Sequence, residues 1–192
     1  YVISDDIYEK LIYDPQPYTS IGSLGKDIFD LTITVNGVSK AYSMTGWRIG
    51  YCSGPKEIME YAKRFQEHST SNPASISQAA ALEALKASDE TIAAMRDEFR
   101  KRRDFMVSAF DKIQEISYSK PQGAFYVFGD ISKLGNSEDV VKKILDEVKV
   151  AFIPGDSFGA PGYARFSFST SMERIQEGTN RIAQWIAKHL SR

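Results

Sequence analysis

A lysine and an arginine eight residues apart, Lys40 and Arg48, are the residues whose types and spacing most favour chemistry in this chain. A short β-branched run, residues 31–35, predicts a strand, and an Asn-Gly pair ends it. Lys40 is therefore expected in a loop just past a strand end, where open α/β sheets bind ligands. A desolvated lysine can form a Schiff base with an aldehyde, and the planar guanidinium suits a phosphate. The pair indicates a cofactor with both groups, although Lys40 taken alone is more simply a surface lysine in a turn.

Composition and charge exclude several classes of protein. The 24 basic and 25 acidic side chains give a net charge of -1, which indicates neither a nucleic-acid nor a membrane partner. The basic run 100–103 lies beside acidic residues in an expected helix and is interpreted as a solvated face. Cys52 is the only cysteine, which fits a reducing compartment, and His68 and His189 are too far apart in the sequence to predict a metal site. No transmembrane run or signal-peptide pattern appears, and a cytoplasmic protein is expected.

The hydrophobic period changes along the chain and predicts two domains of an α/β protein. The first part predicts strands at 1–4, 31–35 and 49–53, a loop over 9–30, and helices at 55–68 and 75–86. A long helix over 88–113 follows. Beyond it we expect strands at 116–119, 123–128, 150–154 and 163–168, a helix at 137–148, and a last helix that opens at 170–173 and turns Leu190 inward. The predicted domains are residues 1–105, with a mostly parallel sheet, and residues 106–192, a smaller α+β unit.

Several short motifs lie at the predicted strand ends. The lysine segment has the pattern Ser-Lys-x(5)-Gly-x-Arg-x-Gly, and Ser4-Asp5-Asp6-x-Tyr8 follows the first strand. The second domain contains Pro121-x-Gly-Ala-Phe-Tyr126, Pro154-Gly-x-x-Phe-Gly159 and Ala164-Arg-Phe-Ser-Phe168. Together these motifs resemble those of class I/II aminotransferases, the fold type I pyridoxal-phosphate enzymes. The resemblance covers essentially all 192 residues and implies the C-terminal part of the cofactor-binding large domain followed by the small domain.

The resemblance implies a role for five residues of this chain. Lys40 would carry pyridoxal 5'-phosphate and act as the catalytic residue. The cofactor would also be bound by Asp5 at the ring nitrogen, Tyr8 at the 3-hydroxyl and Arg48 at the phosphate. Arg165 would bind the α-carboxylate of the substrate. The sequence around Arg165 supports this role, because a charge in an apolar strand needs a partner and a bidentate carboxylate would provide one. The alternative is a structural ion pair with an Asp or Glu of the core.

The activity implied is transfer of an amino group between an amino acid, with aspartate as the expected donor, and a 2-oxo acid. The full-length protein is expected to be a homodimer. This chain is expected to be a C-terminal fragment, because Tyr1 already lies in an expected strand. The resemblance implies that the N-terminal half supplies further cofactor and substrate contacts, so the fragment alone is expected to be inactive. The sequence departs from many relatives at Gly37, where they place a phosphate-binding serine. Two alternatives remain open: a carbon-sulfur β-lyase on the same scaffold, and a non-catalytic, aminotransferase-like sensor module of a regulator.

Overall fold

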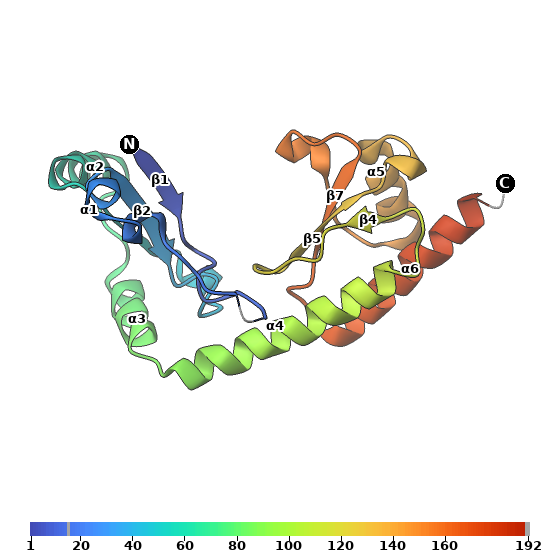
Figure 1. Cartoon of the computed structure of the whole chain (residues 1–192), viewed down its shortest axis with the longest axis horizontal. Helices are drawn as coiled ribbons and strands as arrows, with labels where there is room; N and C mark the ends of the chain where they lie inside the picture. Colours follow the sequence, from blue (N-terminus) through green and yellow to red (C-terminus); the bar gives the residue numbers. More distant parts are fainter. Residues whose placement is uncertain (15, 191–192) are drawn as a thin grey trace. The chain divides into compact units, whose positions relative to one another are not determined.

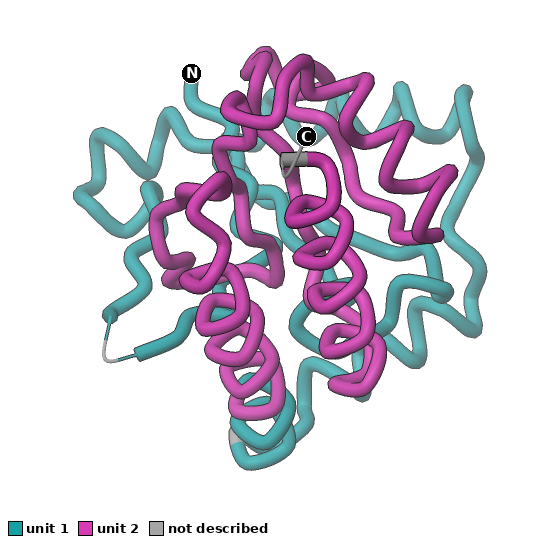
Figure 2. The backbone as a smooth tube through the Cα atoms, turned by 90° about the vertical axis from the view of Figure 1, so that its right-hand side faces the viewer, with its two compact units in different colours: residues 1–96 teal, residues 97–192 magenta. Residues whose placement is uncertain are grey.

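The computed structural model of the chain describes residues 1–14 and 16–190. Pro15 of the predicted 9–30 loop and the side chain of Leu190 lie outside the described residues. The backbone divides into unit 1, residues 1–96, and unit 2, residues 97–192 (Figure 2). This division falls in helix α4 (Asp89–Phe110), which also contains the domain boundary expected between residues 105 and 106. That domain boundary stays a prediction.

Unit 1 is built on a three-stranded sheet in the order β1-β2-β3 (Figure 1). Its strands are β1 (Val2–Asp5), β2 (Thr32–Gly37) and β3 (Gly50–Ser53), and each lies within two residues of its predicted bounds. β1 and β2 run parallel, whereas β2 and β3 are antiparallel. The carboxyl ends of β1 and β2 therefore lie at one edge of the sheet.

The longer helices within unit 1 are α2 (Lys56–Ser69), predicted from its apolar face, and α3 (Ser75–Leu85), predicted from its alanine-rich sequence. The expected loop over 9–30 also contains two short helices, η1 (Ile21–Ser23) and α1 (Lys26–Phe29). They escape a periodicity search because each is only one turn long. Among the described residues, no helix has both the length and the apolar character that crossing a bilayer requires.

Unit 2 is an antiparallel sheet in the order β4-β5-β7-β6, with helices on one face (Figure 1). Its elements are β4 (Ser117–Tyr118), β5 (Tyr126–Asp130), η3 (Ser132–Leu134), α5 (Ser137–Val148), β6 (Ile153–Pro154), η4 (Gly155–Phe158), β7 (Tyr163–Ser167) and α6 (Met172–Leu190). The buried face of the sheet carries Phe166. Its ring centroid lies 4.8 Å from the ring centroid of Phe110 and 4.5 Å from that of Phe152. Burial of each such ring contributes about 1.5–3 kcal/mol. The residues that alternate with Phe166 along β7 face the other way.

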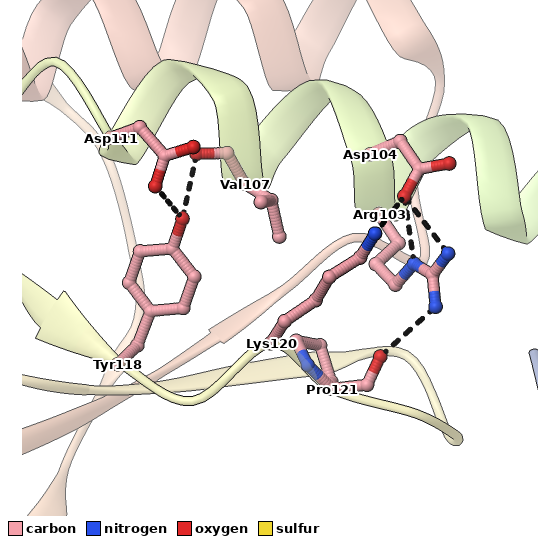
Figure 3. Close-up of polar contacts among 7 residues, drawn as sticks. All are labelled: Arg103, Asp104, Val107, Asp111, Tyr118, Lys120 and Pro121. Atoms are coloured by element: carbon pink, nitrogen blue, oxygen red, sulfur yellow. Dashed lines mark hydrogen bonds and ion pairs between the residues drawn. The ribbon is translucent and has the colours of Figure 1, made fainter.

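Polar contacts tie α4 to the segment that leads into β5 (Figure 3). Arg103 is only 1% exposed, so the interpretation of the basic run as a solvated face is wrong for this residue. Its guanidinium pairs with Asp104 at 2.9 Å and donates to the carbonyl of Pro121 at 3.2 Å. The hydroxyl of Tyr118 lies within hydrogen-bonding distance of the Val107 carbonyl and the Asp111 carboxylate. Burial and the carboxylate raise the pKa of Tyr118, which keeps the phenol neutral.

Candidate active site

The carboxyl ends of β1 and β2 place Asp5 and Lys40 at one edge of the unit 1 sheet. The parallel register pairs Val2 with Thr32 and Asp5 with Val35, so Asp5 closes β1 beside the end of β2. Lys40 follows three residues after the last residue of β2, in a turn. Ligands of open α/β sheets bind outside the carboxyl ends of the strands. The position predicted for Lys40 relative to its strand is therefore confirmed.

Lys40 and Tyr8 lie next to each other. The ammonium nitrogen of Lys40 lies 5.9 Å from the centroid of the Tyr8 ring, and both residues are half-buried. Tyr8 is held in a turn after β1, where its carbonyl accepts a hydrogen bond from the Leu11 amide at 2.8 Å. The Asp5 carboxylate accepts from the Ile7 amide at 3.3 Å within the same turn. The Lys40 amine therefore lies beside the Tyr8 ring, and the Asp5 carboxylate lies in the turn that leads from β1 to Tyr8.

Arg48 directly follows the short helix η2 (Thr45–Trp47) and lies two residues before β3, the strand that pairs with β2. Its backbone is left-handed, with φ of 51°, and its guanidinium donates to the carbonyl of Thr45 at 2.7 Å. The side chain is exposed, so its remaining donors face solvent. Such an arginine can bind an anion such as a phosphate.

Close packing accounts for the glycine three residues before Lys40. A Cβ on Gly37 would lie 3.1 Å from the Cα of Gly50 and 3.2 Å from the Cδ1 of Ile7. These distances are shorter than ordinary contacts between carbon atoms. β3 therefore approaches β2 so closely here that a side chain at position 37 would have to displace its neighbours.

Asp6 is a residue of this region that the sequence analysis did not single out. It is 6% exposed and accepts hydrogen bonds from the hydroxyls of Ser4 at 2.6 Å and Ser20 at 2.8 Å, and from Tyr18. Burial alone would raise the pKa of Asp6, but these hydrogen bonds outweigh it and the pKa is lowered. The charged carboxylate thus anchors residues 18–20 to the end of β1. Within the local sequence, only Ser4, two residues before Asp6, indicated this hydrogen-bond network.

Arg165 belongs to unit 2, where it is half-buried on β7. Arg165 pairs with Phe128 on β5 and with Ile153 on β6. Within residues 97–190, its guanidinium has no carboxylate partner, and it lies over aromatic rings instead. The core ion pair that the sequence left open is therefore not formed in unit 2. The other four predicted site residues all lie in unit 1.

The whole chain is similar to known aminotransferases. Residues 1–182 match the family model described as aminotransferase class I and II. The chain belongs to this family. It is 43% identical to the bifunctional aspartate aminotransferase and glutamate/aspartate-prephenate aminotransferase of Petunia hybrida, over 94% of this chain and 40% of that protein. It is 39% identical to the aspartate aminotransferase of Bacillus subtilis, over 98% of this chain and 49% of that protein.

The solved structures agree with the aminotransferase family. The crystal structure of an aromatic aminotransferase from Pyrococcus horikoshii matches with a TM-score of 0.92 at 36% identity, over 97% of this chain and 51% of that one. The chain spans about half the length of the curated relatives it matches. The resemblance found from the motifs and the predicted α/β class are thus confirmed.

The residues of unit 1 fit a pyridoxal-phosphate group by their chemistry. An aldehyde requires an amine, and Lys40 provides it beside the Tyr8 ring. A ring nitrogen that must stay protonated requires a carboxylate, and Asp5 lies at the same sheet edge. A phosphate requires exposed cationic donors, and Arg48 has them.

Proposed function

We propose that the full-length protein transfers an amino group between an amino acid, with aspartate as donor, and a 2-oxo acid, using pyridoxal 5'-phosphate. The observation that carries this proposal is the Lys40 amine beside the Tyr8 ring at the edge where β1 and β2 end. Family membership supports it, and the names of the Petunia and Bacillus relatives support aspartate as donor.

Each of the five residues has a separate task in this proposal. When bound, the cofactor supplies an aldehyde and an electron-accepting ring. The Nζ of Lys40 accepts the α-proton of the substrate and later donates a proton, as general base and then general acid. Asp5 keeps a positive charge on the ring nitrogen, Tyr8 donates to the ring oxygen, and Arg48 binds the phosphate. Arg165 binds the α-carboxylate and so orients the substrate.

The proposal extends to the assembly. We expect the full-length protein to be a homodimer, and we expect the 192-residue chain alone to have little or no transaminase activity. The family's N-terminal half, as the sequence resemblance implies, supplies further cofactor and substrate contacts. Robust turnover by the purified 192-residue chain would show this expectation to be wrong.

An assay of product formation tests the proposed reaction. The full-length protein loaded with pyridoxal phosphate is expected to form oxaloacetate and glutamate from aspartate and 2-oxoglutarate. Lys40→Ala should abolish the activity, whereas Lys10→Ala, at an exposed lysine of the same unit, should leave it unchanged. Pyruvate release from cystathionine without transamination would instead identify a carbon-sulfur lyase. Absence of both activities would favour a non-catalytic sensor module.

A further inference from the structure

Two aromatic rings hold the guanidinium of Arg165. Its central carbon lies 4.5 Å from the ring centroid of Tyr126 and 4.5 Å from that of Phe158. Both distances lie well inside the range of a cation–π interaction. The N–H donors of a guanidinium point outward in the plane of the group. Rings that lie over that plane therefore leave the N–H donors at its outer edge available to a ligand.

The sheet fixes the first of these rings. Tyr126 pairs with Ser167 and Phe128 pairs with Arg165 across β5 and β7, so Tyr126 and Arg165 are diagonal neighbours on one face. Diagonal neighbours are within reach of aromatic and long side chains. The register of β5 against β7 therefore sets the position of the Tyr126 ring without any ligand.

A tight turn fixes the second ring. Phe158 ends η4, which opens at Gly155 and is followed by Gly159 in the left-handed conformation. The Ser137 hydroxyl donates to the carboxylate of Asp156 and accepts from the Gly162 amide at 3.0 Å, which closes the turn from both sides. The Phe158 ring also packs edge-on against Phe128, with centroids 6.1 Å apart.

These contacts give the Pro154-Gly-x-x-Phe-Gly159 motif a physical purpose. Its glycines allow the turn, and its phenylalanine is the side chain that the turn places over Arg165. An arginine on a strand surface would otherwise sample many rotamers, and a ligand would have to order it on binding. A guanidinium that is already ordered binds its partner at a smaller entropic cost.

We propose that Tyr126 and Phe158 are positioning residues, which hold Arg165 so that its N–H edge is presented to a substrate carboxylate. This inference rests on the proposed function of Arg165 as the carboxylate-binding residue. The two rings, which we call the aromatic clamp, touch the guanidinium and not the reacting atoms. Their removal is expected to weaken carboxylate binding while the sheet that carries Arg165 remains intact.

The test follows the Arg165 side chain by NMR in the 192-residue chain. The Nε–H resonance of Arg165 is titrated with L-aspartate, and sodium chloride of equal ionic strength is the reference. Tyr126→Leu and Phe158→Leu should each raise the dissociation constant about two- to five-fold. Tyr126→Phe keeps a ring and should retain the parent affinity. Tyr163→Leu, on the same sheet face but stacked on Phe128, is the matched control and should change nothing.

The outcomes separate the clamp from the proposed function. An Arg165 resonance that responds to aspartate with equal affinity in the parent and both leucine variants would overturn the clamp and leave the role of Arg165 standing. A parent resonance that does not respond would overturn both. Because Phe158 is 46% exposed, Phe158→Leu should keep the fold and can carry the test if Tyr126→Leu unfolds. In the full-length protein, the same variants should raise KM for the amino donor by a similar factor and change kcat less.

Discussion

Gly155 opens the turn that carries Phe158, and its replacement by alanine should destabilise unit 2 by about 3 kcal/mol or more. A Cβ at this position would lie 2.2 Å from the Ala160 carbonyl oxygen and 2.7 Å from the Cβ of Tyr163. An ordinary contact between carbon and oxygen is about 3.3 Å, so the backbone would have to move by about 1 Å. The nearest atom is a carbonyl oxygen of the backbone, so a change of side-chain rotamer cannot relieve the clash.

The assay is urea unfolding followed by the fluorescence of Trp185, which is 6% exposed in unit 2. The chain has two tryptophans, so a Trp47→Phe background removes the signal from unit 1. Gly178→Ala is the matched control, because its Cβ would meet nothing closer than the Val150 Cγ1 at 3.8 Å. Alanine inside α6 should stabilise it by about 0.5–1 kcal/mol. A Gly155→Ala protein within about 0.5 kcal/mol of its parent would refute the packing argument.

Three further predictions concern stability. The lowered pKa of Asp6 means that its ionised carboxylate stabilises the folded state above the ordinary pKa of 3.8, and that this stability is lost as the pH falls through the lower pKa of the folded state. Asp6→Asn should therefore lose less stability than the parent protein in acid unfolding followed by circular dichroism. An acid transition identical in both proteins would contradict this. Tyr118→Phe should cost about 1–2 kcal/mol in urea unfolding by removing the hydroxyl beside Val107 and Asp111, whereas Tyr61→Phe, at a 63% exposed residue, should cost nothing measurable. Gly37→Ser should lower the free energy of unfolding by about 1–2 kcal/mol because Gly50 approaches closely. Gly46→Ser is the control, because a Cβ at Gly46 would meet nothing within 4 Å. Equal stability of the two variants would argue against the packing explanation.

Local sequence patterns were sufficient to predict most of the secondary structure. Helix α5 matches its predicted bounds at both ends, because Asn136 caps it by accepting from the Asp139 amide and the apolar residues keep a helical period. The strands of unit 1 were found because each is a short apolar run bounded by turn residues. The position of Lys40 followed from the same signals.

The remaining features depend on contacts between residues far apart in the sequence. Asp6 is buried because Ser20, 14 residues away, reaches back to it. Arg103 is buried because the Pro121 carbonyl, 18 residues away, accepts from it. The aromatic clamp likewise requires the register of β5 against β7, which no single segment encodes. The motifs indicated which residues matter in these places, but not what they touch.

The central claim is that Lys40 is the residue that carries the cofactor, and covalent labelling tests it most directly. The full-length protein is loaded with pyridoxal phosphate, reduced with borohydride, digested and analysed by peptide mass spectrometry. The expected result is the mass of the reduced cofactor on the peptide that contains Lys40, and no such mass in Lys40→Ala. Label on another lysine, or an unlabelled Lys40 in protein shown to be loaded with the cofactor, would contradict the account.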